Sequence, residues 1–423
     1  MFEPDTAWIH ALPVVGLILI FVLGTLRSIN LGILSLAATY IVGTLLTRES
    51  LADMYRGFPV DLLILLVGVT YLFGVAASNG TIERIVAAAA ARVQGRRALI
   101  PWVVFVLAAV PTMTGALGSA AAAMLAPIAL RLAERCSLDR RMVGLMVLHG
   151  SACGNFSPLN ALGVIVLQGA ARNGLEVSAT AVFLANVGYN IVLGAAIFLW
   201  FGGLRLGKDS ASLPQTDAEV LQPPATSAPL AHAFTIAALV LVAVLALAFG
   251  WSIGFVALLA AAMLHGLFPQ SSRGAERRIP WDVVLLVCGI VTYVSALQRA
   301  GTVDAIGSGI VALDAPLLSA LLICVVGAVT SAFASSAGIL GVMILLAAPF
   351  MAQGLVNVTG LVIALAISAT VVDSSPFSTA GALVVANAAE SERAVVYRGL
   401  LTWAAVMVVT APLATWLLFV IVP

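Results

Sequence analysis

The chain is poor in charge. Only 9% of its 423 residues are Asp, Glu, Lys or Arg, whereas about 25% is usual in soluble domains. Its 20 basic and 19 acidic residues leave a net charge of +1. So few charges cannot cover the surface of a soluble protein of this length, and without a basic stripe the chain has no attraction for a nucleic acid backbone. Both of these classes of protein are therefore excluded.

Several chemical motifs are missing as well. The four cysteines show no CxxC spacing, so we interpret them as packing residues rather than a disulfide or zinc site. No GxxxxGK followed by Ser or Thr is present, which argues against a nucleotide-driven machine. An intramembrane hydrolase is disfavoured because the chain lacks a GxSG loop and a pair of intramembrane aspartates. We expect no cofactor and no enzymatic activity.

Apolar residues dominate what is present. They make up 62% of the chain, and the mean hydropathy is +1.12. A membrane-spanning helix needs about 20 apolar residues. Runs of about this length or longer occur at 7–26, 29–47, 60–79, 140–170, 177–203, 232–250, 251–268, 281–298, 358–387 and 396–422. The sequence thus predicts an all-α polytopic membrane protein. No basic residue precedes the first run, so we expect that run to be a retained span rather than a cleaved signal peptide.

The apolar pattern occurs twice. A first unit, 1–203, is followed by a polar linker, 204–231, rich in Pro, Ser and Thr, and by a second unit, 232–423. A shift of 221 residues pairs Pro59 with Pro280, Asp61 with Asp282, Gly68 with Gly289 and Gly80 with Gly301. Later in each unit a shift of 218 pairs Ser157 with Ser375, Pro158 with Pro376 and Gly163 with Gly381. Matched Pro, Asp and Gly are hard to obtain by chance, so the units are predicted to be repeats.

Basic residues predict the topology. Each unit also holds a long apolar stretch interrupted by small and hydroxyl residues, at 98–131 and 316–353. If both stretches are re-entrant hairpins, only Arg48, Arg56, Arg172 and Arg299 of the 20 basic residues lie on one side. Because Lys and Arg collect in cytoplasmic loops, we expect both termini outside and the linker inside, in the inner (plasma) membrane. Five spans per unit then make the repeats inverted, an architecture typical of secondary transporters.

Two predicted spans, 140–170 and 358–387, contain a proline at their centre. Pro158 and Pro376 each remove a helix donor, and the hydroxyl and amide side chains around them suit a broken helix. The new helix start beyond each break would present its positive pole to an anion. The carbonyl ends before the breaks, with Asn155 and Asp373, suit a monovalent cation. An aspartate at membrane depth costs about 2.5 to 3.5 kcal/mol and usually has a function.

His149 lies just before the first break and leaves two interpretations open. Its imidazole could relay protons, because its charge changes near neutral pH. Alternatively, it could form a hydrogen bond to a nearby backbone group.

The segments "CGNFSPLNALGVIV" and "VVDSSPFSTAGALVVANA", with the two hairpins, resemble MatC-type dicarboxylate carriers of the ion transporter superfamily. The chain is more distantly similar to divalent anion:sodium symporters. The resemblance implies a homodimer in which a fixed scaffold supports a moving domain that carries both hairpins and both broken helices, as in an elevator. It departs at the hairpin tips, because the symporters' Ser-Asn-Thr signatures are replaced by "TMTGALGS" and "SAFASSAG".

The resemblance also implies the site residues. One cation would lie between the tip 112–119 and the break 155–160, a second between the tip 330–338 and the break 373–379, and the substrate carboxylates between them. The implied substrate-binding residues are Thr114, Ser119, Asn155, Ser157, Asn160, Ser335, Ser336, Ser375, Ser378 and Thr379. The implied cation ligands are Asn155, Ser157, Asp373 and Ser374.

The function expected from these features is Na⁺- or H⁺-coupled symport of a small dicarboxylate such as malonate or a C4 acid. The expected partners are a small anionic substrate, the lipid bilayer and a second copy of the chain. A Na⁺/H⁺ or arsenite exchanger on the same scaffold is the nearest alternative. A channel is less compatible, because two closed hairpin tips suit alternating access better than an open pore.

Overall fold

The structure, a computed structural model, describes residues 4–27, 29–82, 84, 85, 97–207, 229–303, 305, 315–332 and 336–422. Over these ranges the regular structure is helical, and no strand occurs in them. The first unit contains α1 (Pro4–Arg27), α2 (Leu31–Val42), α3 (Leu51–Arg56), α4 (Val60–Ser78), α6 (Ile100–Met113), α7 (Gly118–Arg135), α8 (Arg140–Cys153), α9 (Ala161–Arg172) and α10 (Ala179–Trp200). The second contains α11 (Pro229–Phe249), α12 (Ile253–Leu267), α13 (Trp281–Arg299), α15 (Pro316–Ser331), α16 (Ser336–Ala352), α17 (Val358–Val371), α18 (Thr379–Ala386) and α19 (Arg393–Trp416).

Short helical turns extend or connect these helices. The π-helical turns η1 (Gly43–Thr47) and η7 (Leu417–Ile421) continue α2 and α19. The 3₁₀ turns are η2 (Arg97–Leu99), η3 (Gly203–Gly207), η5 (Ala275–Arg278) and η6 (Val372–Ser374). Much of the predicted linker, residues 208–228, and the predicted site residue Ser335 lie outside the described residues.

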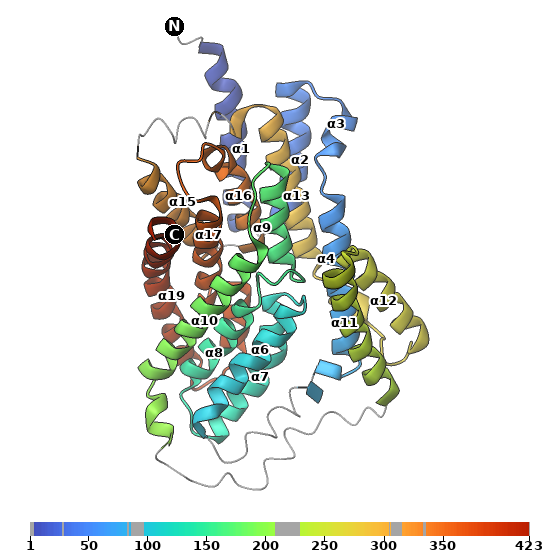
Figure 1. Cartoon of the computed structure of the whole chain (residues 1–423), viewed down its shortest axis with the longest axis vertical. Helices are drawn as coiled ribbons and strands as arrows, with labels where there is room; N and C mark the ends of the chain where they lie inside the picture. The colour runs from blue at the N-terminus through green and yellow to red at the C-terminus, as the bar shows by residue number, and fades with distance from the viewer. Residues whose placement is uncertain are drawn as a thin grey trace.

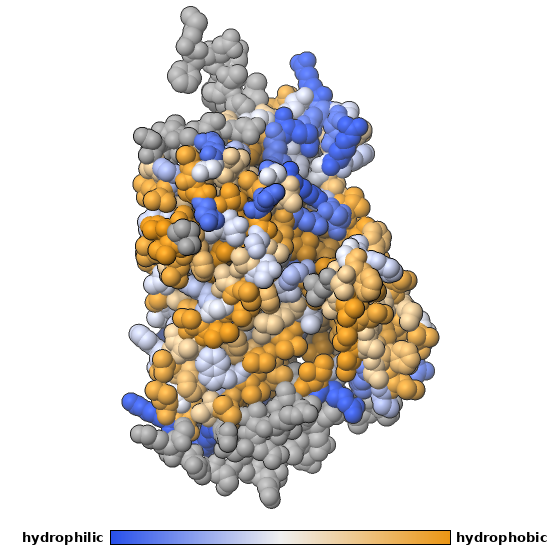
Figure 2. All heavy atoms as spheres, viewed as in Figure 1, coloured by the Kyte–Doolittle hydropathy of each residue, from blue (hydrophilic) through white to orange (hydrophobic). Residues whose placement is uncertain are grey.

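The helices have the dimensions and surface of a membrane protein. Within the described residues, six segments are long and apolar enough to cross a bilayer, namely Val60–Ser78, Ala179–Trp200, Pro229–Ala246, Trp281–Arg299, Val358–Ala386 and Arg393–Ile421. Hydrophobic residues cover the middle of the face in Figure 2, and hydrophilic residues gather near its two ends. The all-α membrane fold predicted from the apolar runs is confirmed, because each predicted run coincides with a helix or with two helices separated by a break.

The helices pack in two groups. In the scaffold group, α2 packs against α13, and α4 packs against α12. Helix α1 contacts α2, and α11 contacts α12. In the carrier group, α8 packs against α6, α7 and α10, while α17 packs against α15 and α19. Three more helices complete the carrier group. Helix α18 packs against α7, and α9 and α16 pack against each other. The interface between the groups includes contacts of α13 with α16 and of α4 with α9.

Glycine lets the scaffold helices cross closely at two equivalent places. A Cβ on Gly68 of α4 would lie 2.1 Å from the carbonyl oxygen of Gly254 in α12. A Cβ on Gly289 of α13 would lie 2.1 Å from the carbonyl oxygen of Gly32 in α2. Neither contact leaves room for a side chain. Gly68 and Gly289 are paired by the 221-residue shift, so each unit contributes the same glycine to a crossing with a helix of the other unit.

The two interrupted stretches form helical hairpins. Helices α6 and α7 contact each other and are separated by residues 114–117, and α15 contacts α16 across residues 332–335. Figure 1 shows α6 and α7 in the lower half of the view and α15 and α16 in the upper half. The broken helices α8–α9 and α17–α18 pass beside them, so both breaks lie near the hairpin tips.

Candidate functional site

The first break is a capped loop that fixes the first hairpin tip. The Asn160 side chain accepts a hydrogen bond from the Leu162 backbone N–H at 2.9 Å and so caps α9. Its Nδ2 donates to the carbonyls of Thr112 at 2.9 Å and Ala116 at 2.8 Å. The Ser157 hydroxyl donates to the Met113 carbonyl at 2.6 Å. These bonds tie carbonyls at the end of α6 and in the hairpin tip to the first break.

The second break has the same backbone pattern 218 residues later. The N–H of Ser157 donates to the Gly154 carbonyl at 3.1 Å, and that of Ser375 donates to the Val372 carbonyl at 2.9 Å. One turn on, Ser378 takes the place of Asn160: its hydroxyl accepts from the Gly381 N–H at 3.0 Å and caps α18. The Ser378 hydroxyl also donates to the carbonyls of Asp373 and Ser375. The side-chain bonds of Ser378 thus stay within the second break and the first turn of α18.

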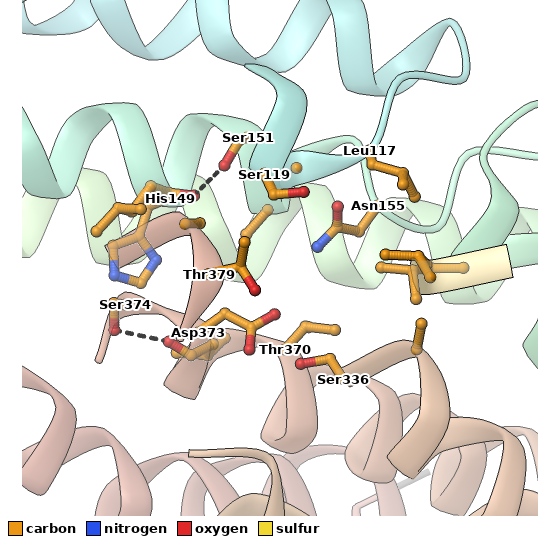
Figure 3. A pocket seen from close by; sticks show the side chains of 18 residues that line it. Leu117, Ser119, His149, Ser151, Asn155, Ser336, Thr370, Asp373, Ser374 and Thr379 are labelled. Carbon is orange, nitrogen blue, oxygen red and sulfur yellow. Dashed lines mark hydrogen bonds between the residues drawn. The ribbon is translucent and has the colours of Figure 1, made fainter. Parts of the chain in front are cut away.

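A cavity of about 90 Å³ lies where the hairpin tips and the breaks meet. The starts of α7, α9, α16 and α18 and the ends of α8 and α17 all contribute to its wall. Figure 3 shows Ser119 and Asn155 of the first unit approaching it from one side, and Asp373 and Ser336 of the second unit from the other. The cavity is therefore shared by both units, with helix N-termini and C-termini facing the same space.

The polar atoms in this cavity are not all paired. Asn155 is 4% exposed, and its Oδ1 is buried without a hydrogen-bond partner. Asp373 forms no ion pair with a described residue, and no Lys or Arg is among the described residues that line the cavity. An unpartnered buried oxygen is costly unless something binds it. Within the described ranges no three His, Cys, Asp or Glu side chains gather in a way that would hold a metal ion.

The residues predicted for the site divide into two sets. Those that line the cavity are Ser119, Asn155, Ser336, Asp373, Ser374 and Thr379. The others with described positions, which are not among the lining residues, are Thr114, Ser157, Asn160, Ser375 and Ser378. Of the second set, Ser157 and Asn160 tie the hairpin tip to the first break, Ser378 caps α18, and Ser375 accepts from the Phe377 N–H at 3.2 Å. Thr114 is exposed and bonds only to carbonyls of its own helix.

Two hydroxyl side chains in the lining lay outside the sequence prediction. Ser151 and Thr370 are in the last turns before the breaks and are both buried. They lie four residues before Asn155 and three before Asp373, and this spacing puts them on the same helix face as those residues. Helical periodicity measured backward from each break would have identified them. Their hydroxyls donate to helix carbonyls, Ser151 to Leu148 at 2.8 Å and Thr370 to Ala366 at 2.9 Å.

His149 also lines the cavity, and side chains hold both of its ring nitrogens. Trp403 Nε1 donates to His149 Nε2 at 2.8 Å, and His149 Nδ1 lies 3.2 Å from Asn190 Oδ1. An indole N–H is only a donor, so Nε2 must be unprotonated, and the proton of the neutral ring is assigned to Nδ1. Asn190 Nδ2 donates to Asn186, whose own amide donates to the carbonyls of the last two residues of α8 at 2.9 and 3.0 Å. A relay would require the bond from Trp403 to break.

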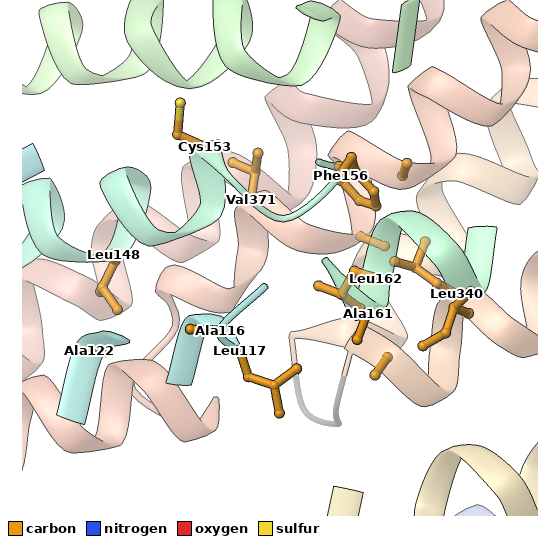
Figure 4. Packing of buried hydrophobic residues seen from close by; sticks show 14 of the residues in the cluster. Ala116, Leu117, Ala122, Leu148, Cys153, Phe156, Ala161, Leu162, Leu340 and Val371 are labelled. Atoms are coloured by element: carbon orange, nitrogen blue, oxygen red, sulfur yellow. The ribbon is translucent and has the colours of Figure 1, made fainter. Parts of the chain in front are cut away.

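Apolar packing from both units fixes the surroundings of the first break. Phe156 is 1% exposed, and Leu340 of α16 and Val371 of α17 belong to the same buried cluster. Figure 4 shows Phe156 within the break, Leu162 at the start of α9, and Leu340 beside Leu162. Residues of both units thus pack together around the first break.

Comparison with known proteins agrees with this architecture. Residues 8–155 match the family described as the dicarboxylate carrier protein MatC N-terminus. The matched segment covers about a third of the chain. The predicted resemblance to MatC-type carriers is confirmed over this segment, which includes the first hairpin and ends before Pro158, and it points to a transporter rather than an enzyme.

The fold is shared with the Alcanivorax borkumensis YdaH transporter, whose crystal structure is described as having an unusual topology. The TM-score is 0.61 at 15% identity, over 91% of this chain and 96% of that chain. At this identity the likeness establishes the fold. A search of curated proteins gave no significant match.

Proposed function

We propose that the protein is a secondary active transporter that carries a small dicarboxylate together with Na⁺ or H⁺. One observation carries the proposal: both hairpin tips and both helix breaks line a single cavity that contains the unpartnered oxygen of Asn155 and the carboxylate of Asp373. The MatC-type match supports the substrate class, because that family is described by its dicarboxylate carriers.

The cavity offers complementary partners for a dianion and a cation. The first residues of α7, α9, α16 and α18 line it, and helix starts carry partial positive charge and free N–H groups that suit carboxylates. The oxygens of Asn155 and Asp373 suit a hard monovalent cation or a proton. Because no Lys or Arg lines the cavity in the described residues, a coupled cation would supply the positive charge that balances the substrate.

The membrane potential supplies a reason for coupling. Moving one charge through 100 mV is worth about 2.3 kcal/mol, so importing a bare dianion into a negative cell would cost about 4.6 kcal/mol. That cost corresponds to more than a thousandfold concentration ratio at about 1.36 kcal/mol per factor of ten. Two cations would cancel the charge of the dianion, and a third would make import electrically favourable.

Contacts between the two groups support alternating access by movement of the carrier group. At the end of α9, Arg172 Nη2 lies 2.6 Å from Asp61 Oδ1 in the first turn of α4. The next residue, Asn173, accepts from Gln298 Nε2 of α13 at 3.0 Å. These polar contacts join the carrier group to the scaffold group, and they are partly exposed, so they can exchange with water when the groups slide. A homodimer held together through the scaffold belongs to the same proposal.

The experiment is uptake of radiolabelled malonate and succinate into proteoliposomes under imposed Na⁺ or H⁺ gradients. We expect accumulation above the equilibrium level with one gradient and its collapse when the matching ionophore is added. Uptake that ignores both gradients would contradict cation coupling.

The alternative, a Na⁺/H⁺ or arsenite exchanger, is tested in the same vesicles. An exchanger would move protons in response to Na⁺, or would take up arsenite, without any dicarboxylate present. Purified protein stabilised against heat by malonate or succinate, and not by arsenite, would favour the carrier.

A further inference from the structure

A second cavity, of about 340 Å³, lies beside the central one. The two cavities share the wall residues Leu117, Ser119, Val283 and Thr379. The rest of its wall comes from the second half of α4, the beginning of α7, the start of α13 and α18. It therefore lies between the scaffold group and the carrier group, and we call it the side cavity. Its volume is almost four times that of the central cavity.

Arg278 is the single basic residue among the described residues that line either cavity. It ends the turn η5 and is exposed. Its backbone is held against α4, because a Cβ on Gly74 would lie 2.6 Å from the Ala275 carbonyl and 3.4 Å from the Arg278 Cβ. The guanidinium thus extends from a fixed base on the wall of the side cavity.

The charges around Arg278 leave its guanidinium open to a ligand. No ion pair joins Arg278 to another described residue. Asp282 lines the same cavity but lies in the first turn of α13, where its carboxylate complements the helix N-terminus. On the other side of η5, Glu276 pairs with His265 at 3.4 Å. Arg277 is exposed next to Arg278 and is not a lining residue of the side cavity.

We propose that Arg278 forms an anion-capture site in the side cavity, where a small carboxylate binds before it enters the central cavity or after it leaves. The inference rests on the proposed function. The approach to the central cavity otherwise presents Asp282 at its rim and Asp373 inside, and both repel an anion. A fixed cation on the wall offsets this repulsion and raises the local concentration of carboxylate, which speeds association without contributing to the final bound state.

The test compares Arg278→Gln with Arg277→Gln, which removes the same charge from the adjacent exposed position. Initial rates of malonate or succinate uptake are measured in proteoliposomes at about 20 mM and about 300 mM salt, and equilibrium binding is measured by calorimetry in detergent. We expect Arg278→Gln to lower kcat/KM at least about threefold at low salt, with a smaller loss at high salt because screening weakens steering. Arg277→Gln should change it by less than half as much, and Arg278→Lys should restore most of the rate.

The outcomes separate the two proposals. If wild-type protein neither binds nor transports either dicarboxylate, the proposed function fails, and the capture site fails with it. If wild-type protein transports and the two Gln variants lose rate equally, the capture site alone is overturned. The lost rate would then reflect the overall positive charge of the turn η5 and not a site at Arg278. A loss that does not depend on salt would also overturn it. Equal unfolding midpoints of the variants show that a lowered rate is not misfolding.

Discussion

Asn160 offers a test of how the hairpin tip is held. The substitution Asn160→Ala removes the amide that bonds to the Thr112 carbonyl at 2.9 Å and the Ala116 carbonyl at 2.8 Å. It also removes the acceptor that caps α9. Asn160 is 0% exposed, so water does not replace these bonds without rearrangement. Three groups of the hairpin tip and the break each lose a hydrogen bond together.

The size of the effect follows from these bonds. A typical buried hydrogen bond contributes about 0.5 to 1.5 kcal/mol net, and replacement of an Asn cap by Ala costs about 1 kcal/mol. Two tip bonds and one cap therefore predict a loss of about 2 to 4 kcal/mol in the free energy of unfolding. Thr114→Ala is the matched control on the same tip, because its hydroxyl is exposed and bonds only within α6. A surface change of this kind costs within about 0.5 kcal/mol.

The assay is the midpoint of thermal unfolding in detergent, measured for both variants and for Ser378→Ala. Ser378 caps α18 but makes its side-chain bonds within its own loop, so we expect its variant to lie between the other two. Uptake should be lost in Asn160→Ala and retained in Thr114→Ala. If Asn160→Ala is as stable as Thr114→Ala, the break does not pin the tip, and the role assigned to Asn160 is wrong.

The other predictions concern the cavity. Asp373→Asn should lower cation-driven accumulation at least about tenfold, because a bond to a charged group contributes about 1.5 to 3 kcal/mol. As a control, Ser375→Ala changes a hydroxyl outside the lining, and its accumulation should stay near the wild-type level. If Asp373→Asn accumulates substrate at the wild-type level, the Asp373 carboxylate has no part in the mechanism. His149→Gln should keep uptake within about threefold and leave its pH profile unchanged, because a neutral amide can accept from Trp403 and donate to Asn190. A lost or shifted profile would restore His149 as a proton relay.

The sequence alone was sufficient for the helices and for their interruptions. Apolar runs fix the spans because a bilayer demands about 20 apolar residues wherever the backbone crosses it. Proline with hydroxyl and amide side chains beside it favours the breaks, since it removes a donor and clashes with the preceding turn. For this reason α8 ends at Cys153 and α17 at Val371, shortly before Pro158 and Pro376. Matched residues in the two units likewise predicted that the breaks would look alike.

Only the tertiary structure decided which polar residues face the cavity. Around each break the sequence offers several hydroxyl and amide groups of similar chemistry, and a local pattern does not say which of them bond to the protein itself. Ser157 and Asn160 are bound to a hairpin tip more than forty residues earlier, and this leaves Asn155 as the unpartnered oxygen. The protonation of His149 likewise depends on Trp403, 254 residues away. Such partners are set by packing between distant helices, which hydrophobic periodicity does not record.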